Sequence, residues 1–163
     1  MSSTQTDFRM ALDIRWATRS APIWHKSRNS SLAAKDGLRY EKKVGKELER
    51  LGAGGRFTQV EHNPWFRFKD LYGIACCSPD FLLHRPEGLV IVEVKLTWVD
   101  VAIHKLNDLY SPVVSFALGK PCRPLVICRN LTRDAPPSCS TLNTALASPH
   151  HLLHWPEIGQ IRW

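Results

Sequence analysis

The clearest structural signal in the chain is SPDFLLHRPEGLVIVEVKLT, residues 78 to 97. In an extended strand, alternate residues point to opposite faces. One face of the second half would carry Leu89, Ile91, Glu93 and Lys95, and the other face Val90, Val92, Val94 and Leu96. Both faces are apolar as far as Ile91, which predicts an interior strand covered on both sides. Glu93 and Lys95 therefore come at the end of a buried face, where an unpaired charge is costly.

The first half of the stretch predicts a β-hairpin whose loop is RPEG, residues 85 to 88. With His84 and Leu89 as the closing pair, the register places Asp80 directly opposite Glu93, about 5 Å away. A loop shifted by one residue would instead put these two carboxylates on opposite faces of the sheet. The predicted cluster therefore depends on the register of the hairpin.

Two opposed carboxylates destabilise a sheet unless positive charge lies between them. Lys95 can supply part of that charge. A divalent cation such as Mg²⁺, which favours carboxylate and carbonyl oxygens, would supply the rest. The alternative is a structural ion pair between Glu93 and Lys95, with Asp80 independent of both.

A third carboxylate favours the clustered arrangement. LRYEKKVGKELERL, residues 38 to 51, has apolar residues at helical spacing, and GAGG ends the predicted helix. Glu41 lies three residues before Val44 and seven before Leu48, on the apolar stripe of this helix. A single inward glutamate is often only a boundary residue. Together with the hairpin carboxylates, it predicts a site at one end of the sheet.

The remaining elements follow from periodicity and from Gly and Pro positions. Residues 1 to 36 favour an arm or a loosely packed start, which could contain one short helix around 7 to 18. We then expect strands in 57 to 68 interrupted near Asn63 and Pro64, a helix over 100 to 110 and a helical restart at Ser111 that stops at Gly119. After these we expect a buried strand over 123 to 130, loops over 132 to 150 and an edge strand over 159 to 163. The order of helix, strands, helix and strand predicts a mixed α/β domain with helices on a central sheet.

Composition limits the class of protein. A chain of 163 residues suffices for one domain, and the formal net charge of +7 permits an anionic partner such as nucleic acid. No apolar run approaches the roughly 18 residues of a membrane span, and the first residues do not resemble a signal peptide. The five cysteines form no CxxC pair, so neither a zinc ribbon nor a disulfide framework is expected. We therefore expect a reducing, cytoplasmic setting and no membrane partner.

These residues resemble the PD-(D/E)xK nuclease superfamily. The resemblance rests on Glu41 in a first helix, on Pro79 and Asp80, and on Glu93-Val94-Lys95 in an apolar strand. It covers about residues 37 to 130, leaving an N-terminal arm (1 to 36) and a C-terminal extension (131 to 163). It implies a restriction-endonuclease-like core of the order αβββαβ. KLNDLYSPVV is similar to a helix of the phage- and RecB-type exonuclease branches, with Asn107 nearest to a Gln of those branches and Tyr110 after it.

The resemblance implies a Mg²⁺- or Mn²⁺-dependent deoxyribonuclease of phage or mobile-element DNA processing, recombination or repair, acting in the bacterial host if phage-encoded. Asp80, Glu93 and the carbonyl of Val94 would bind the metal, with Glu41 binding through a water or at a second metal. Lys95 would orient the attacking water and stabilise the transition state. Some members of the superfamily hold an iron–sulfur cluster with cysteines on both sides of the core. No cysteine precedes Cys76 in this sequence, so we expect no iron–sulfur cluster.

DNA is the expected partner, and a homodimer that cuts both strands is one arrangement this function allows. Candidate substrate contacts are Lys42, Lys46, Lys105 and Tyr110, although solvated helix faces explain them equally well. Trp65 and Phe66 beside Arg67 could stack on bases or belong to the core. The alternative function is a catalytically silent nuclease-fold protein that serves as a nucleic-acid-binding or assembly module.

Overall fold

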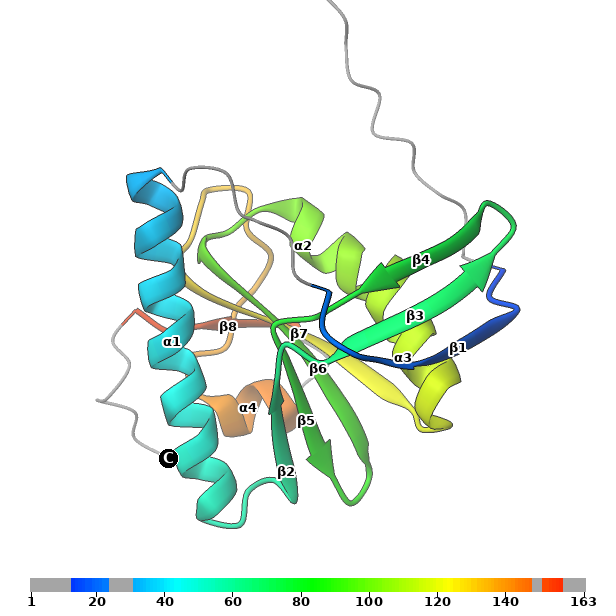
Figure 1. The fold of residues 1–163 in the computed structure, drawn as a ribbon. Helices are drawn as coiled ribbons and strands as arrows, with labels where there is room; N and C mark the ends of the chain where they lie inside the picture. The colour runs from blue at the N-terminus through cyan, green and yellow to red at the C-terminus, as the bar shows by residue number, and fades with distance from the viewer. Residues whose placement is uncertain (1–12, 24–30, 148–150, 157–163) are drawn as a thin grey trace, which may run out of the picture.

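The computed structural model describes residues 13–23, 31–147 and 151–156, and its strands form two sheets (Figure 1). The larger sheet has the strand order β2-β5-β6-β7-β8. Its strands are β2 (Gln59–His62), β5 (Phe81–Arg85), β6 (Gly88–Thr97), β7 (Cys122–Asn130) and β8 (Leu152–His154). The pairs β2–β5 and β5–β6 are antiparallel, whereas β6–β7 and β7–β8 are parallel. The predicted mixed α/β class is confirmed.

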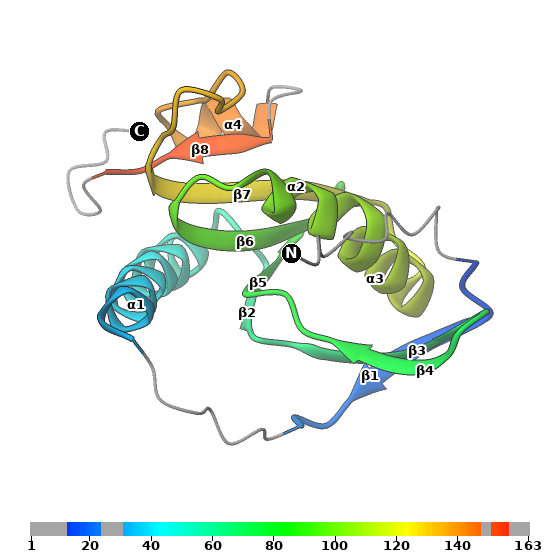
Figure 2. The same cartoon turned by 90° about the horizontal axis from the view of Figure 1, so that it is seen from above.

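Helices cover both faces of the larger sheet (Figure 2). One face packs against α1 (Leu32–Ala53) and α4 (Leu142–Ala147), and the other against α2 (Asp100–Lys105), the π-helical turn η1 (Leu106–Tyr110) and α3 (Ser111–Leu118). Val90, Val92 and Val94 lie in the core under α1, and Leu89 and Ile91 in the core under α3. The strand is therefore buried on both sides, as its alternation predicted.

The hairpin register is the one that the sequence predicted. His84 pairs with Leu89 and Leu82 with Ile91, and Arg85 also pairs with Gly88, which leaves only residues 86 and 87 in the turn. Gly88 has a φ of 150°, and a Cβ there would lie 2.8 Å from the carbonyl oxygen of Pro121. A side chain at this position would therefore collide with the backbone that leads into β7.

The second sheet was not predicted. It has the order β1-β3-β4, with β1 (Trp16–Ser20), β3 (Trp65–Asp70) and β4 (Gly73–Cys77), and all pairs are antiparallel. The β3–β4 hairpin is inserted between β2 and β5, and Phe66 and Phe68 of β3 join the core under α3. The break near Asn63 and Pro64 is confirmed, and Asn63 has a φ of 48°.

The N-terminal segment differs from the prediction. The helix expected around 7 to 18 is wrong for its described part, because residues 16–20 form β1 and pair with β3. Pairing with a neighbouring strand outweighs the weak local helical pattern, and Trp16 and Thr18 are good strand formers. Helix α1 begins at Leu32 rather than Leu38, so it includes the last residues of the predicted arm.

Two further differences concern the helices. Ser111 does not cap a new helix, since its φ of −61° and ψ of −46° are helical and the chain runs on into α3. The π-helical turn ends two residues before Pro112, whose missing N–H interrupts regular helical hydrogen bonding. The expected loop over 132 to 150 contains α4. The stop at Gly119 is confirmed by its φ of 63°, and the strand expected over 159 to 163 lies outside the described residues.

The early start of α1 predicts a stability effect at Ser31. Its hydroxyl accepts a hydrogen bond from the N–H of Ala34 at 3.2 Å, which caps the helix. Ser31→Ala should lower the free energy of unfolding by about 1 kcal/mol, and Ser31→Asp should not. Urea unfolding of both variants measures this difference. No loss in Ser31→Ala would mean that the helix effectively begins near Leu38.

Candidate functional site

The end of the β5–β6 hairpin brings three of the predicted residues together. Asp80 directly precedes β5, and continuing the observed register places it opposite Glu93 on the same face. The carbonyl of Asp80 accepts a hydrogen bond from the N–H of Asn63 at 2.9 Å, which fixes its backbone to the end of β2. Glu93 is only 2% exposed, and the Nζ of Lys95 lies 2.9 Å from its Oε1.

The carboxyl of Asp80 lies in an environment that disfavours its charge. Burial raises its pKa to about 7, and the negative charge of Glu93 is the second cause. The hydrogen bond that its Oδ2 accepts from the N–H of Val94 at 2.7 Å opposes the shift, as does the charge of Lys95. The carboxyl therefore requires more positive charge than the described residues supply to be fully ionised at neutral pH.

Backbone geometry makes the carbonyl of Val94 available at the same place. In an antiparallel pair, the N–H and C=O groups of one residue point toward the same neighbouring strand. The N–H of Val94 bonds to Asp80, so its carbonyl also points toward the β5 side. The residue opposite Val94 in the continued register is Pro79, which has no N–H to donate. Because Pro79 has no N–H, the carbonyl of Val94 receives no hydrogen bond from the strand opposite it.

Glu93 contacts a second lysine that comes from α2. The Nζ of Lys105 lies 3.5 Å from Oε1 of Glu93 and 4.9 Å from the centre of the Tyr110 ring. The other oxygen of this carboxylate, Oε2, is buried and has no hydrogen-bond partner among the described residues. Burial, followed by the charges of Glu93 and Asp80, raises the pKa of the Tyr110 phenol, so the phenol stays protonated.

The ammonium of Lys95 is held in its charged form. Burial acts to lower its pKa, but the ion pair with Glu93 and the charges of Asp80 and Glu41 outweigh burial, so the pKa is raised. A lysine in this state donates hydrogen bonds and does not act as a base. It can therefore orient a polar ligand or neutralise an anion beside the two carboxylates.

Glu41 reaches the same end of the sheet from α1. Its charge contributes to the raised pKa of Asp80, and its Oε1 lies 3.2 Å from Nε2 of His62 at the end of β2. The His62 ring stacks on Phe81, with ring centroids 4.7 Å apart. His62 was not among the residues predicted for the site. The signal available for it was a polar residue directly before the predicted break at Asn63 and Pro64.

A cavity of about 750 Å³ opens beside this cluster, between the ends of β2 and β4 and the helical segment η1. Residues from both sheets line it together with Lys105, Leu109 and Tyr110. The site thus connects through His62 and Lys105 to a space large enough for a nucleotide-sized group. Two of the four predicted substrate contacts, Lys105 and Tyr110, lie here.

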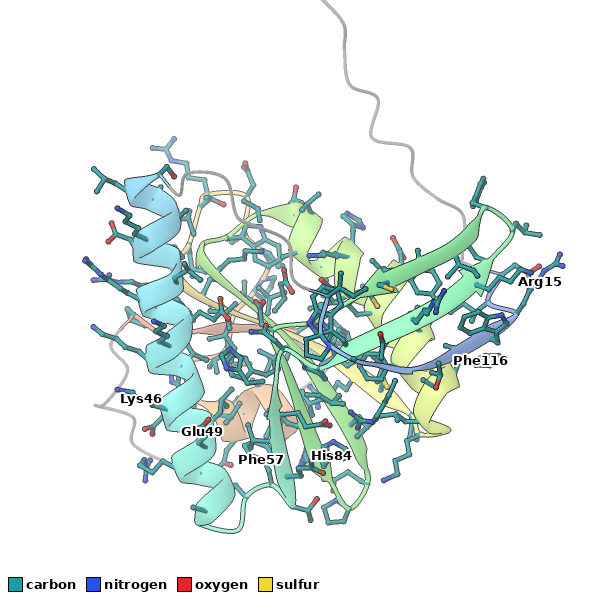
Figure 3. The ribbon with its side chains drawn as sticks, viewed as in Figure 1. Arg15, Lys46, Glu49, Phe57, His84 and Phe116 are labelled. Carbon is teal, nitrogen blue, oxygen red and sulfur yellow. The ribbon has the colours of Figure 1, made fainter. Side chains whose placement is uncertain are left out.

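The other two predicted contacts do not join the site. Lys42 and Lys46 are exposed on α1, four residues apart and therefore on one side of the helix. Figure 3 shows Lys46 pointing away from the sheet. The structure therefore places this pair on a solvated helix face, the alternative that the sequence left open.

The residues of the site have the oxygen donors that a hard cation prefers, but they do not form a complete coordination shell. Among the described residues, no group of three or more His, Cys, Asp or Glu side chains is arranged to hold a metal ion. The donors that do meet are the carboxylates of Asp80 and Glu93 and the carbonyl of Val94, all oxygen ligands of the kind that Mg²⁺ prefers. Mg²⁺ usually keeps several waters and takes only one or two protein carboxylates, so this donor set suits it.

Comparison with known proteins adds no relative. No known protein family, no curated protein and no solved structure matches the chain. In the described parts of the chain, no helix combines the length and the apolar character needed to cross a membrane.

Proposed function

We propose that this chain is a metal-dependent nuclease that hydrolyses DNA phosphodiester bonds. The observation that carries the proposal is the pair of carboxylates, Asp80 and Glu93, at the end of a buried hairpin with the ammonium of Lys95 against them. Buried like charges are costly, and such groups cluster where chemistry needs them. The order α1, β2, β5, β6, α2, β7 supports a restriction-endonuclease-like core with the β3–β4 hairpin as an insertion.

Asp80, Glu93 and the carbonyl of Val94 would hold the metal, and Glu41 would act through a water. A bound Mg²⁺ or Mn²⁺ supplies an activated water and neutralises the charge that develops on the phosphate. Lys95 stays protonated, and it would orient the attacking water and donate hydrogen bonds to the phosphate oxygens in the transition state. Lys105 adds a second positive charge on the cavity side.

The net charge of +7 favours association with a polyanion. Its counterions would be released on binding, so affinity should fall as salt rises. The substrate would thus be attracted by the surface as a whole, whereas cleavage would depend on the few residues at the hairpin end.

The test is a cleavage panel of linear, circular, single-stranded and branched DNA with Mg²⁺ or Mn²⁺. We expect cleavage of at least one substrate, none with EDTA, and a higher melting temperature in the presence of the metal because only the folded site binds it. Lys46→Ala, on the solvated face of α1, serves as the control that keeps activity. No cleavage of any substrate by the wild type would contradict the proposal.

One observation favours a second candidate, a catalytically silent nucleic-acid-binding module. Glu93 already has two lysines within ion-pair distance, so its charge is balanced without a metal. A silent module would bind DNA in the cleavage panel without cutting it. A melting temperature unaffected by Mg²⁺ and Mn²⁺, together with tight binding, would favour this candidate over the nuclease.

A further inference from the structure

The outer face of the three-stranded sheet carries no described helix or strand. In Figure 2, α3 lies on one side of β1, β3 and β4, and no described element covers the other side. The inner face buries Phe66 and Phe68, which are 0% and 1% exposed. Residues of the opposite parity, such as Trp65, Arg67 and Lys69, therefore point outward.

Aromatic and cationic side chains share this outer face. The register pairs Trp16 with Lys69 and Thr18 with Arg67, and paired residues point to the same side of the sheet. Arg67 and Lys69 are exposed, and the indoles of Trp16 and Trp65 are partly exposed. Neither tryptophan belongs to the hydrophobic cores, where Phe66 is fully buried. Of the two residues suggested for base stacking, Phe66 is thus excluded and Trp65 remains.

The charge of the face has one sign. Within β1, β3 and β4 the only acidic residue is Asp70. It is 4% exposed and points to the inner face of the sheet, as Phe68 does. A face that carries two cations beside two indoles, with no exposed carboxylate in its strands, is complementary to an anionic polymer that also carries aromatic groups. Unpaired nucleotides have both properties, whereas an acidic peptide supplies only the charge.

This face is continuous with the cavity of the candidate site. Trp65, which pairs with Ser20, and Cys76, which pairs with Arg67, point to the outer face of the sheet. Both residues also line the cavity. Lys105 lines the same cavity and contacts Glu93. A strand lying along β3 from Trp16 to Trp65 would therefore arrive at the carboxylate cluster.

We propose that the outer face of the three-stranded sheet binds single-stranded nucleic acid, with bases stacking on Trp65 and Trp16 and phosphates contacting Arg67 and Lys69. If the bound strand is the substrate on its way to the carboxylate cluster, the proposal rests on the proposed nuclease function. The binding itself does not. Duplex bases are already stacked and paired, so the indoles favour an unpaired strand over a duplex of equal length.

The test measures fluorescence anisotropy of a labelled oligothymidylate of about 16 nucleotides and of the matching duplex, both in EDTA so that cleavage plays no part. The wild type should bind the single strand more tightly than the duplex. Trp65→Leu keeps apolar bulk but removes the aromatic face, so it should bind the single strand on the order of tenfold more weakly. Trp65→Phe should stay close to the wild type.

The cations have a separate readout. Arg67→Ala should reduce the slope of log affinity against log salt by about 0.7, the value for one phosphate contact on a single strand. Lys46→Ala removes an equal charge on α1, on a different side of the molecule, and should leave the slope nearly unchanged. Thermal unfolding of each variant shows whether the fold is intact.

Equal binding by Trp65→Leu and Trp65→Phe, or an equal effect of Lys46→Ala and Arg67→Ala, would overturn the proposal. A duplex bound as tightly as the single strand would also overturn the proposal, since it would indicate that the face recognises phosphates and not unpaired bases. Because these measurements use no metal, they can succeed if the nuclease proposal fails, and cleavage can persist if they fail.

Discussion

Lys95→Ala should lose on the order of 10²-fold or more in cleavage rate while its affinity for DNA changes little. The loss is the scale expected when one donor that stabilises transition-state charge is removed. The ammonium of Lys95 lies 2.9 Å from Oε1 of Glu93 and is held protonated there, so it is placed to act on a phosphate beside the carboxylates. Binding should persist because phosphate attraction is spread over the basic surface.

The paired measurement is cleavage in Mg²⁺ and binding in Ca²⁺, a larger cation with looser coordination. Lys95→Met is a useful second variant, because it keeps the apolar stem that packs at the end of β6. Lys46→Ala is the matched control, a lysine that Figure 3 shows pointing away from the sheet. Equal cleavage rates in the wild type and both Lys95 variants would remove Lys95 from the mechanism and attribute any activity to another source.

The hairpin could be predicted because its information is local. The turn residues and the alternation of LVIVEVKL define one register, and that register alone places Asp80 opposite Glu93. The apolar stripe of α1 is also local information. It predicted that Glu41 lies at the same end of the sheet, where its charge acts on Asp80. In each case the periodicity of a single element decides which face a residue occupies.

The second sheet could not be predicted because its pairings join distant parts of the chain. Trp16 pairs with Lys69, and β1 has only five residues, too few for a periodicity to be distinguished from chance. Strand β4, GIACC, is equally short. The insertion of β3 and β4 between β2 and β5 likewise leaves no local signal, because the strands on either side pair with each other across it.

The candidate site shows the same division. Its carboxylates and Lys95 lie in one hairpin and could be placed from the sequence. The ion pair of Lys105 with Glu93 depends on how α2 packs on the sheet, and the contact of His62 with Glu41 depends on two separate elements. For Lys42 and Lys46 the sequence left open a phosphate contact or a solvated helix face, and both side chains are exposed on α1.

Asp80→Asn should stabilise the metal-free protein at pH 8 by about 2 kcal/mol and should have almost no effect at pH 4. Burial and the charge of Glu93 raise the pKa of Asp80 to about 7, whereas an aspartate in the unfolded chain titrates near 3.9. Between these values the folded state holds the proton more tightly. The wild type therefore loses stability as pH rises from about 4 to about 7, and the loss is complete above the folded-state pKa.

The full shift would correspond to about 4 kcal/mol, and the expected gain is about half of it because the carboxyl is partly exposed and solvent screens its charge. Asparagine removes the titration but keeps an oxygen that can accept the hydrogen bond from the N–H of Val94. Urea unfolding at pH 4 and pH 8 measures both differences. Destabilisation at pH 8 would instead indicate that Asp80 is part of a structural ion-pair network.

The same variant separates a metal site from a merely crowded pair of carboxylates. Mg²⁺ should raise the stability of the wild type at pH 8 by the amount that its binding constant dictates, and this gain should shrink or vanish in Asp80→Asn. Cleavage should be lost with it, although the apo protein has become more stable. Lys46→Ala should keep both the metal-induced gain and the activity. A variant that gains as much from Mg²⁺ as the wild type would show that Asp80 is not a metal ligand.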